Sequence, residues 1–243
     1  MLPIGDVNPT RTTPFVNYVL LAGNIAAFVW QSILIAAGGE GWVVPGYGLV
    51  PTRLLNDPLG ETFTLFTSMF MHGDWMHLLG NMLYLHIFGD NVEDAMGHLR
   101  YLGFYLACGV LAGLVQVAIG PDSTIPMVGA SGAIAGVLGG YMVLYPVAPI
   151  KVLNTFPPLW LLLGFIFEVP AWLVVGAWFL WNLSSGVGQL GMDAAGGVAF
   201  FAHVGGFLAG LLLVRSATAD RDRREWRRWS GWKPPETRNW RRG

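Results

Sequence analysis

The sequence predicts an all-α, polytopic membrane protein with six membrane-spanning helices, and three observations lead to that fold class. Only 12% of the 243 residues are charged, about half the roughly 25% that is usual for soluble domains. The chain contains 33 Gly and 11 Trp. Gly allows close contact between membrane helices, and Trp favours the membrane–water interface. Long apolar segments also recur along the chain. Together these features exclude an ordinary soluble core.

Six segments are apolar enough to cross a bilayer, for which a helix needs roughly 17–25 residues. They cover residues 15–37, 74–91, 100–119, 131–146, 168–187 and 196–214. The first segment is too long for the core of a cleavable signal peptide, so we expect an uncleaved span after a polar, loop-like segment, 1–14. In the apolar run 159–167 we expect an interfacial or re-entrant piece. The fifth span then begins at Glu168, because an acidic residue suits a helix N-terminus.

The basic residues predict the orientation. With six spans, both termini lie on one side of the membrane, and that side carries every Lys and Arg except Arg53. The positive-inside rule makes this side cytoplasmic. A compact chain in which we expect no targeting peptide favours a bacterial inner membrane. We interpret the basic tail, 216–243, as a topology signal attracted to anionic lipid rather than as a nucleic-acid-binding segment. The external loop 38–71 ends in an apolar stretch, 62–71, and is expected to be partly embedded.

Two chemically useful side chains lie inside these apolar, glycine-spaced segments. Ser131 begins the fourth predicted span, and His203 lies roughly 10 Å below the start of the sixth, at 1.5 Å per residue. Both spans run inward, so both side chains are expected in the outer part of the membrane. Polar groups at membrane depth are costly and usually mark a functional site. A nucleophile and a base so placed indicate covalent catalysis within the bilayer.

The second predicted span adds two hydrogen-bond donors at the same depth. His77 and Asn81 are four residues apart and therefore share one face of a helix. Both can donate a hydrogen bond to a developing oxyanion. Glycines spaced by four residues predict close helix contact on the fourth and sixth spans. They are Gly132, Gly136 and Gly140 on the fourth span, and Gly206 and Gly210 on the sixth.

These residues resemble the rhomboid family of intramembrane serine proteases. The matching motifs are His72-x4-His77-x3-Asn81, Gly129-Ala130-Ser131-Gly132 and Ala202-His203-x2-Gly206-x3-Gly210. The resemblance extends from about residue 15 to residue 215. We therefore expect a cytoplasmic segment over 1–14, a membrane protease domain over 15–215, and a cytoplasmic tail over 216–243.

The resemblance implies a six-helix rhomboid fold and a role for each matching residue. Ser131 would be the nucleophile and His203 the general base. His77, Asn81 and the backbone N–H of Ser131 would form the oxyanion hole. Supporting residues would be His72, which would buttress the external loop, and Gly129, Gly132 and Gly206. The implied substrates are single-span membrane proteins, and no metal or organic cofactor is implied.

The chain departs from some members of the family at two places. Phe63 and Thr64 stand where those members carry a Trp-Arg pair in the first external loop. Ala135 stands where others place a Tyr that stacks on the catalytic His, so another group must position His203. Two rival hypotheses remain: a catalytically inactive relative that binds membrane proteins, and a small transporter or channel.

Overall fold

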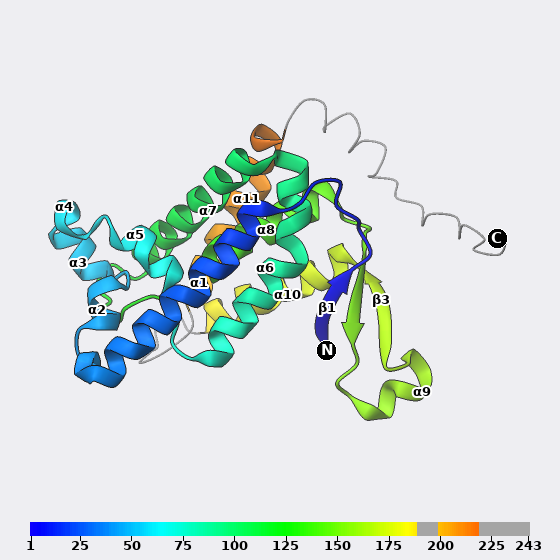
Figure 1. The fold of residues 1–243 in the computed structure, drawn as a ribbon, viewed down its shortest axis with the longest axis horizontal. Helices are drawn as coiled ribbons and strands as arrows, with labels where there is room; N and C mark the ends of the chain where they lie inside the picture. Colours follow the sequence, from blue (N-terminus) through cyan, green and yellow to red (C-terminus); the bar gives the residue numbers. More distant parts are fainter. Residues whose placement is uncertain (189–198, 219–243) are drawn as a thin grey trace.

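The structure is a computed structural model that describes residues 1–188 and 199–218, and most of these residues are helical (Figure 1). The long helices are α1 (Phe15–Leu34), α6 (Trp75–Met96), α7 (His98–Ile119), α8 (Ser131–Leu144), α10 (Ala171–Gly188) and α11 (Phe200–Ala217). Within the described residues, Phe15–Gly39, α7 and α11 are long and apolar enough to cross a membrane, and α8 is a shorter apolar helix. The chain is therefore a membrane protein with a mainly helical fold.

A helix lies at each of the six predicted segments, but several boundaries differ from the prediction. The second helix continues to Met96 and ends at Gly97, whose φ of 81° breaks the helical path. The fourth ends at Leu144 rather than at residue 146. The sixth begins at Phe200, and the predicted start at residues 196–198 lies outside the described residues.

A small antiparallel sheet contradicts the all-α prediction. It consists of β1 (Leu2–Asp6), β2 (Pro149–Leu153) and β3 (Ile166–Pro170), in the order β1-β2-β3. The segment 1–14 was expected to be a polar loop, and it supplies β1. Ile150 and Val152 are buried while Lys151 between them is exposed, which is the alternation of a strand with one covered face.

The β2–β3 hairpin also corrects the prediction for the segment before the fifth helix. After β2 the chain forms a 3-10 turn, Pro157–Leu159, and a short helix, α9 (Trp160–Leu163). Strand β3 then occupies part of the run predicted as an interfacial or re-entrant piece. Helix α10 begins at Ala171 and not at Glu168, because Glu168 pairs with Lys151 in the sheet.

The first external loop is built from short helices. A π-helical turn, Ile35–Gly39, extends α1, and a 3-10 turn, Ser68–Phe70, precedes α6. Between them lie α2 (Val43–Tyr47), α3 (Pro51–Asn56), α4 (Pro58–Glu61) and α5 (Thr64–Thr67). Leu65 and Met69 in the predicted apolar stretch are buried against the helices. Its partial embedding in lipid stays a prediction.

Helix α8 lies in the middle of the bundle and contacts α6, α7, α10 and α11. Its contact with α11 is a contact between backbones. A Cβ at Gly206 would lie 2.0 Å from the carbonyl oxygen of Gly132, and a Cβ at Gly210 would lie 2.0 Å from that of Gly136. Any side chain at these two positions on α11 would therefore push the helices apart.

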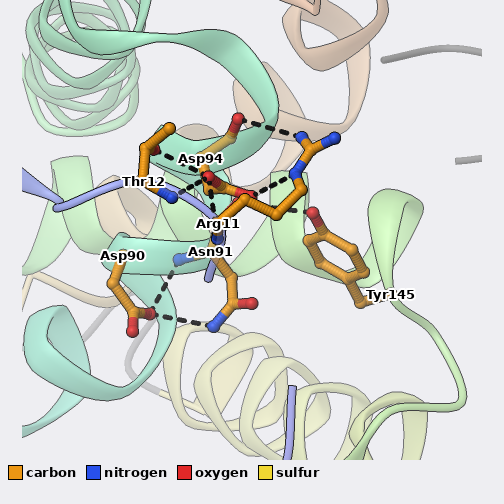
Figure 2. Close-up of polar contacts among 6 residues, drawn as sticks. All are labelled: Arg11, Thr12, Asp90, Asn91, Asp94 and Tyr145. Atoms are coloured by element: carbon orange, nitrogen blue, oxygen red, sulfur yellow. Dashed lines mark hydrogen bonds and ion pairs between the residues drawn. The ribbon is translucent and has the colours of Figure 1, made fainter. Parts of the chain in front are cut away.

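At the Tyr145 end of α8, a polar network fastens the segment before α1 to the end of α6 (Figure 2). Arg11 Nε lies 3.0 Å from Asp94 Oδ2, and Thr12 Oγ1 donates to Asp94 Oδ1 over 2.7 Å. One turn earlier on α6, Asn91 Nδ2 donates to Asp90 Oδ1 over 3.0 Å. Tyr145 Oη donates to the Asn91 carbonyl oxygen over 3.4 Å. This network fixes the end of the bundle that lies opposite Ser131.

Candidate active site

The structure brings the predicted nucleophile and base together. Ser131 is the first residue of α8, and His203 lies in the first turn of α11. His203 Nε2 is 2.7 Å from Ser131 Oγ, which is hydrogen-bond distance. The close backbone contact between α8 and α11 allows two short side chains from separate helices to meet.

The other ring nitrogen of His203 meets a residue that the sequence analysis missed. His203 Nδ1 lies 2.6 Å from Oδ1 of Asn182, a buried residue of α10. The Asn182 amide nitrogen donates to the carbonyl oxygen of Trp178 over 2.8 Å. Since that carbonyl can only accept, the amide oxygen of Asn182 must face the imidazole. Nδ1 of His203 therefore carries a proton, and Nε2 presents its lone pair to the Ser131 hydroxyl.

Trp178 lies beside the imidazole of His203, whereas Ala135 provides no aromatic ring. Its ring centroid lies 5.7 Å from that of His203, with the planes tilted by 38°. Trp178 and Asn182 are four residues apart and share one face of α10. A polar Asn within a predicted span is the signal that could have identified this pair from the sequence.

His77 lies beside the loop that leads into Ser131. The backbone N–H of Gly73 donates to His77 Nδ1 over 3.3 Å, so the neutral ring carries its proton on Nε2. A Cβ at Gly129 would lie 2.7 Å from His77 Nε2 and 3.4 Å from Ser131 Oγ. Gly129 also has a φ of +128°, which disfavours other residues. Gly129 therefore keeps open the space between His77 and Ser131.

Asn81 supplies a donor that has no partner in the described protein. Its side chain is 8% exposed, and Nδ2 makes no hydrogen bond to any described residue. Asn81 and His77 line one cavity of about 610 Å³ together with Ser131 and His203. The backbone N–H of Ser131 has no acceptor within its own helix, because Ser131 is the first residue of α8. Several donors thus lie around the cavity that Ser131 and His203 line.

His72 lies outside that cavity and connects the external loop to α1. Its backbone N–H donates to Gln31 Oε1 over 3.1 Å, and Gln31 Nε2 donates back to the His72 carbonyl over 2.6 Å. The His72 ring is fully buried, with Nδ1 lying 3.3 Å from the Phe70 carbonyl oxygen. These bonds hold the turn that leads into α6 and therefore place His77.

Gly132 and Gly206, the remaining predicted supporting residues, set the distances between helices. A Cβ at Gly132 would lie 2.7 Å from the Cβ of Ala112 on α7. The loop before α8 is held as well, since the Gly129 N–H donates to the Ser68 carbonyl over 2.9 Å. The site is thus fixed by close helix packing on one side of Ser131 and by a backbone hydrogen bond on the other.

Sequence comparison now places the chain among known proteins. The family model described as the rhomboid domain matches residues 59–218. The chain belongs to the rhomboid family. Its membrane-compatible helices agree with the polytopic membrane fold that membership implies.

Several curated rhomboid proteins are similar to this chain. Rhomboid-like protease 5 of Toxoplasma gondii is 33% identical over 169 residues, which are 67% of this chain and 17% of that protein. Rhomboid protein 1, mitochondrial, of Saccharomyces cerevisiae is 29% identical over 204 residues, or 80% of this chain and 51% of that protein. Rhomboid protease GlpG of Salmonella choleraesuis is 28% identical over 154 residues, or 63% and 48%. The chain spans about half or less of these relatives' length.

Proposed function

We propose that this rhomboid-family protein is an intramembrane serine endopeptidase. Its substrates would be single-span membrane proteins, cut in or near their transmembrane segments. The observation that carries the proposal is the 2.7 Å contact between His203 Nε2 and Ser131 Oγ, at the edge of a cavity that also holds His77 and Asn81. The relatives named as rhomboid proteases support the same assignment.

Acylation follows from these positions. His203 Nε2 takes the hydroxyl proton of Ser131 as Oγ attacks the scissile carbonyl carbon. The carbonyl oxygen becomes an oxyanion, which accepts hydrogen bonds from Asn81 Nδ2, His77 Nε2 and the Ser131 N–H. When the tetrahedral intermediate collapses, the C–N bond breaks and the protonated His203 gives its proton to the departing amine. An ester between Ser131 and the N-terminal part of the substrate remains.

Hydrolysis of that ester reverses the proton transfers. His203 removes a proton from a water molecule in the cavity, and the hydroxide attacks the ester carbonyl. The same donors hold the second oxyanion, and His203 then returns the proton to Ser131 Oγ. A Ser–His pair can do this without a carboxylate if its surroundings orient the imidazole.

The substrate must present an extended peptide to reach Ser131. A spanning helix hides its amide groups in hydrogen bonds, so the scissile segment must unwind before attack. Gly or Pro near the cut lowers the cost of unwinding. We therefore propose a preference for substrates with helix-breaking residues close to the cleavage site.

We further propose six spans with both termini in the cytoplasm of a bacterial inner membrane. Residues 15–215 would form the protease domain, flanked by the cytoplasmic segment 1–14 and the tail 216–243. In support, Arg11 and Asp94 form an ion pair at the bundle end opposite Ser131. The positive-inside rule assigns the basic end to the cytoplasm, so Ser131 would face the outer side.

The test is cleavage by the purified protein of a panel of single-span substrates in detergent, with each substrate containing a helix-breaking residue. Wild type is expected to produce two fragments from at least one substrate and to react with a fluorophosphonate probe. Ser131→Ala and His203→Ala are expected to produce no fragments. Ser184→Ala and His86→Ala, at exposed helix positions, are the matched controls and are expected to retain wild-type activity.

Fragments that persist in both Ser131→Ala and His203→Ala would overturn the dyad assignment. A folded wild-type protein that binds these substrates without cutting any of them, and that ignores the probe, would favour a non-catalytic relative. Proton or ion flux in reconstituted vesicles that survives Ser131→Ala would instead favour a transporter or channel.

A further inference from the structure

We propose that Asn182 is a positioning residue for His203. Its side-chain carbonyl fixes the imidazole in the tautomer and orientation that leave Nε2 free to accept the Ser131 proton. This inference rests on the proposed function and identifies a group that positions His203, since Ala135 provides no aromatic ring for that purpose.

The hydrogen-bond chain leaves one consistent set of donors and acceptors. Asn182 Nδ2 donates to the Trp178 carbonyl oxygen over 2.8 Å, which turns Asn182 Oδ1 toward His203 Nδ1 at 2.6 Å. The Trp178 carbonyl belongs to the preceding turn of the same helix, so the amide is held by its own backbone. An acceptor at Nδ1 selects the imidazole form with the proton on Nδ1 and the lone pair on Nε2.

Among the described residues around His203, no other side chain replaces Asn182 as a hydrogen-bond acceptor for Nδ1. Asn182 is 4% exposed, so water has little access to replace its carbonyl. Trp178 and Phe200 contact the His203 ring through aromatic faces and edges and offer no acceptor to Nδ1. Ala135 has no polar atom beyond the backbone. Among the described residues, the imidazole nitrogens of His203 hydrogen-bond to Asn182 and Ser131 alone.

The proposal also assigns a function to α10. This helix makes its main helix contact with α11 and a smaller one with α8. Movement of α10 away from α11 would separate Asn182 from His203 and release the imidazole. Attachment of the orienting residue to this helix therefore couples the competence of the base to the packing of α10 against α11.

The test uses three substitutions that separate hydrogen bonding from packing. Asn182→Leu keeps the side-chain volume and removes the acceptor, while Asn182→Ala removes both. Asn182→Asp keeps an acceptor toward Nδ1. Loss of a hydrogen bond to a group that becomes charged in the reaction is expected to lower kcat about 10–100-fold, with KM nearly unchanged, in the Leu and Ala variants. The Asp variant is expected to recover most of that loss.

A second readout does not depend on cleavage. The ¹⁵N spectrum of labelled histidine, with the His203 signals assigned from His203→Ala, is expected to show protonated Nδ1 in wild type and a mixture of tautomers in Asn182→Leu. Unchanged tautomer signals together with wild-type kcat in Asn182→Leu would overturn the proposal. If wild type itself cleaves nothing, the proposed function fails, and the spectrum still decides whether Asn182 orients His203.

A separate observation concerns the β2–β3 hairpin, which extends away from the helix bundle with α9 at its tip (Figure 1). Exposed apolar side chains cover this tip. They are Phe156, Trp160, Leu162, Phe165 and Ile166. The segment from Asn154 to Phe167 contains no Asp, Glu, Lys or Arg. At the base of the hairpin, by contrast, the exposed Lys151 and Glu168 are cross-strand partners.

We infer that this tip inserts into the lipid leaflet at the bundle end opposite Ser131. The hairpin leaves the bundle after α8 and returns directly into α10, so its base is fixed where the lipid-facing helices end. Charges lie toward the base, at Lys151, at Glu168 and at the N-terminal ammonium group that bonds to Thr155, while aromatic and aliphatic side chains cover the tip. This order matches the change from headgroups to hydrocarbon. An exposed apolar surface without charged side chains, in a chain whose helices are apolar enough to cross a membrane, favours lipid as its partner.

The test is spin-label accessibility in liposomes that contain only this protein. Cys108 is the only cysteine, so Cys108→Ala provides the background for single labels. A label at Leu162→Cys is expected to be accessible to oxygen and shielded from a water-soluble nickel chelate, as is a label at Leu212→Cys on the exposed face of α11. A label at Lys151→Cys is expected to show the opposite pattern.

Water accessibility at position 162 equal to that at position 151 would overturn the lipid assignment. Spin–spin broadening at position 162 that disappears on dilution with unlabelled protein would also overturn it, because the tip would then contact a second copy of the chain.

Discussion

The two ends of α8 differ in their polar groups. At the Ser131 end, Asn81 lines a cavity and its Nδ2 has no hydrogen-bond partner among the described residues. At the Tyr145 end, polar groups form a dense hydrogen-bond network. Glu93 accepts hydrogen bonds from the backbone N–H groups of Val16 and Asn17 over 2.9 Å and 2.7 Å. Tyr141 Oη donates to Asp6 over 2.6 Å. The donor of Asn81 is thus unpartnered at one end of this helix, whereas Glu93 and Asp6 are hydrogen-bonded at the other.

The difference indicates which polar groups stabilise the fold and which remain available to bind a ligand. A buried donor without a partner costs roughly 1–3 kcal/mol, so it persists where a ligand or transition state supplies the acceptor. Paired groups at the opposite end contribute to the stability of the fold instead. Substitutions at the two ends are therefore expected to separate activity from stability, and the contact between α8 and α11 is expected to affect both.

The largest effect is expected from Gly206→Ala, which breaks the contact shared by both ends. A Cβ at this position would lie 2.0 Å from the Gly132 carbonyl oxygen, so α11 must move away from α8. We expect complete loss of cleavage, because Ser131 and His203 separate. Overpacking is also expected to lower the free energy of unfolding by about 3 kcal/mol, measured by denaturant titration in detergent.

The matched control is Gly103→Ala on α7, where an added Cβ meets nothing within 4 Å. This variant is expected to keep wild-type activity and stability. Equal behaviour of the two alanine variants would contradict the backbone contact between α8 and α11.

The next effect is confined to the Ser131 end. Asn81→Ala removes the unpartnered donor, and kcat is expected to fall roughly 10²–10³-fold, as it does when one oxyanion donor is lost. The free energy of unfolding is expected to stay the same or to rise slightly, because no protein hydrogen bond is broken. Steady-state kinetics and denaturant titration measure the two quantities. Full activity in this variant would exclude Asn81 from the oxyanion hole.

A third substitution acts at the paired end alone. Glu93→Gln places an amide N–H₂ against one of the two backbone N–H groups from which Glu93 accepts hydrogen bonds. The free energy of unfolding is expected to fall by about 2 kcal/mol, the size of a hydrogen bond to a charged group. The value of kcat is expected to be unchanged under folding conditions. Glu168→Gln on the exposed side of β3 is the control. A large fall in kcat for Glu93→Gln would show that the two ends are coupled.

The sequence allowed prediction of the helical segments and of the candidate dyad because both depend on local patterns. Length and apolarity marked the helices, and depth along two spans placed Ser131 and His203 on the same side. Asn182 was missed because its importance depends on the packing of α10 against α11, which the sequence does not show. The supporting Trp178 escaped notice for the same reason.

The sheet could not be predicted for a different physical reason. Strands β1 and β2 are far apart in the sequence, and their pairing of Leu2 with Leu153 is a long-range contact. Each strand is also too short to show a clear alternation by itself. A run such as 159–167, which is apolar throughout, fits a helix, a strand or an interfacial segment equally well until its partners are known.

The last effect depends on pH and is expected at Asp6, where strand β1 meets the helix bundle. Burial raises the pKa of Asp6 from 3.8 to about 7. The hydrogen bond from Tyr141 and the charge of Lys151 lower it in part, while the nearby Asp90 carboxylate raises it. A raised pKa in the folded state means that folding favours the protonated acid. The stabilising contribution is therefore complete below pH 3.8 and is lost as the pH rises from about 4 to about 7.

Asp6→Asn mimics the protonated acid and removes this titration. The difference in free energy of unfolding between Asp6→Asn and wild type is therefore expected to grow in favour of the variant from pH 4 to pH 7 and then to level off. Denaturant titrations of both proteins at matched pH values measure that difference. Parallel curves over this range would mean that Asp6 titrates alike in the folded and unfolded chains. The contact between β1 and Tyr141 would then contribute no pH dependence to the free energy of unfolding.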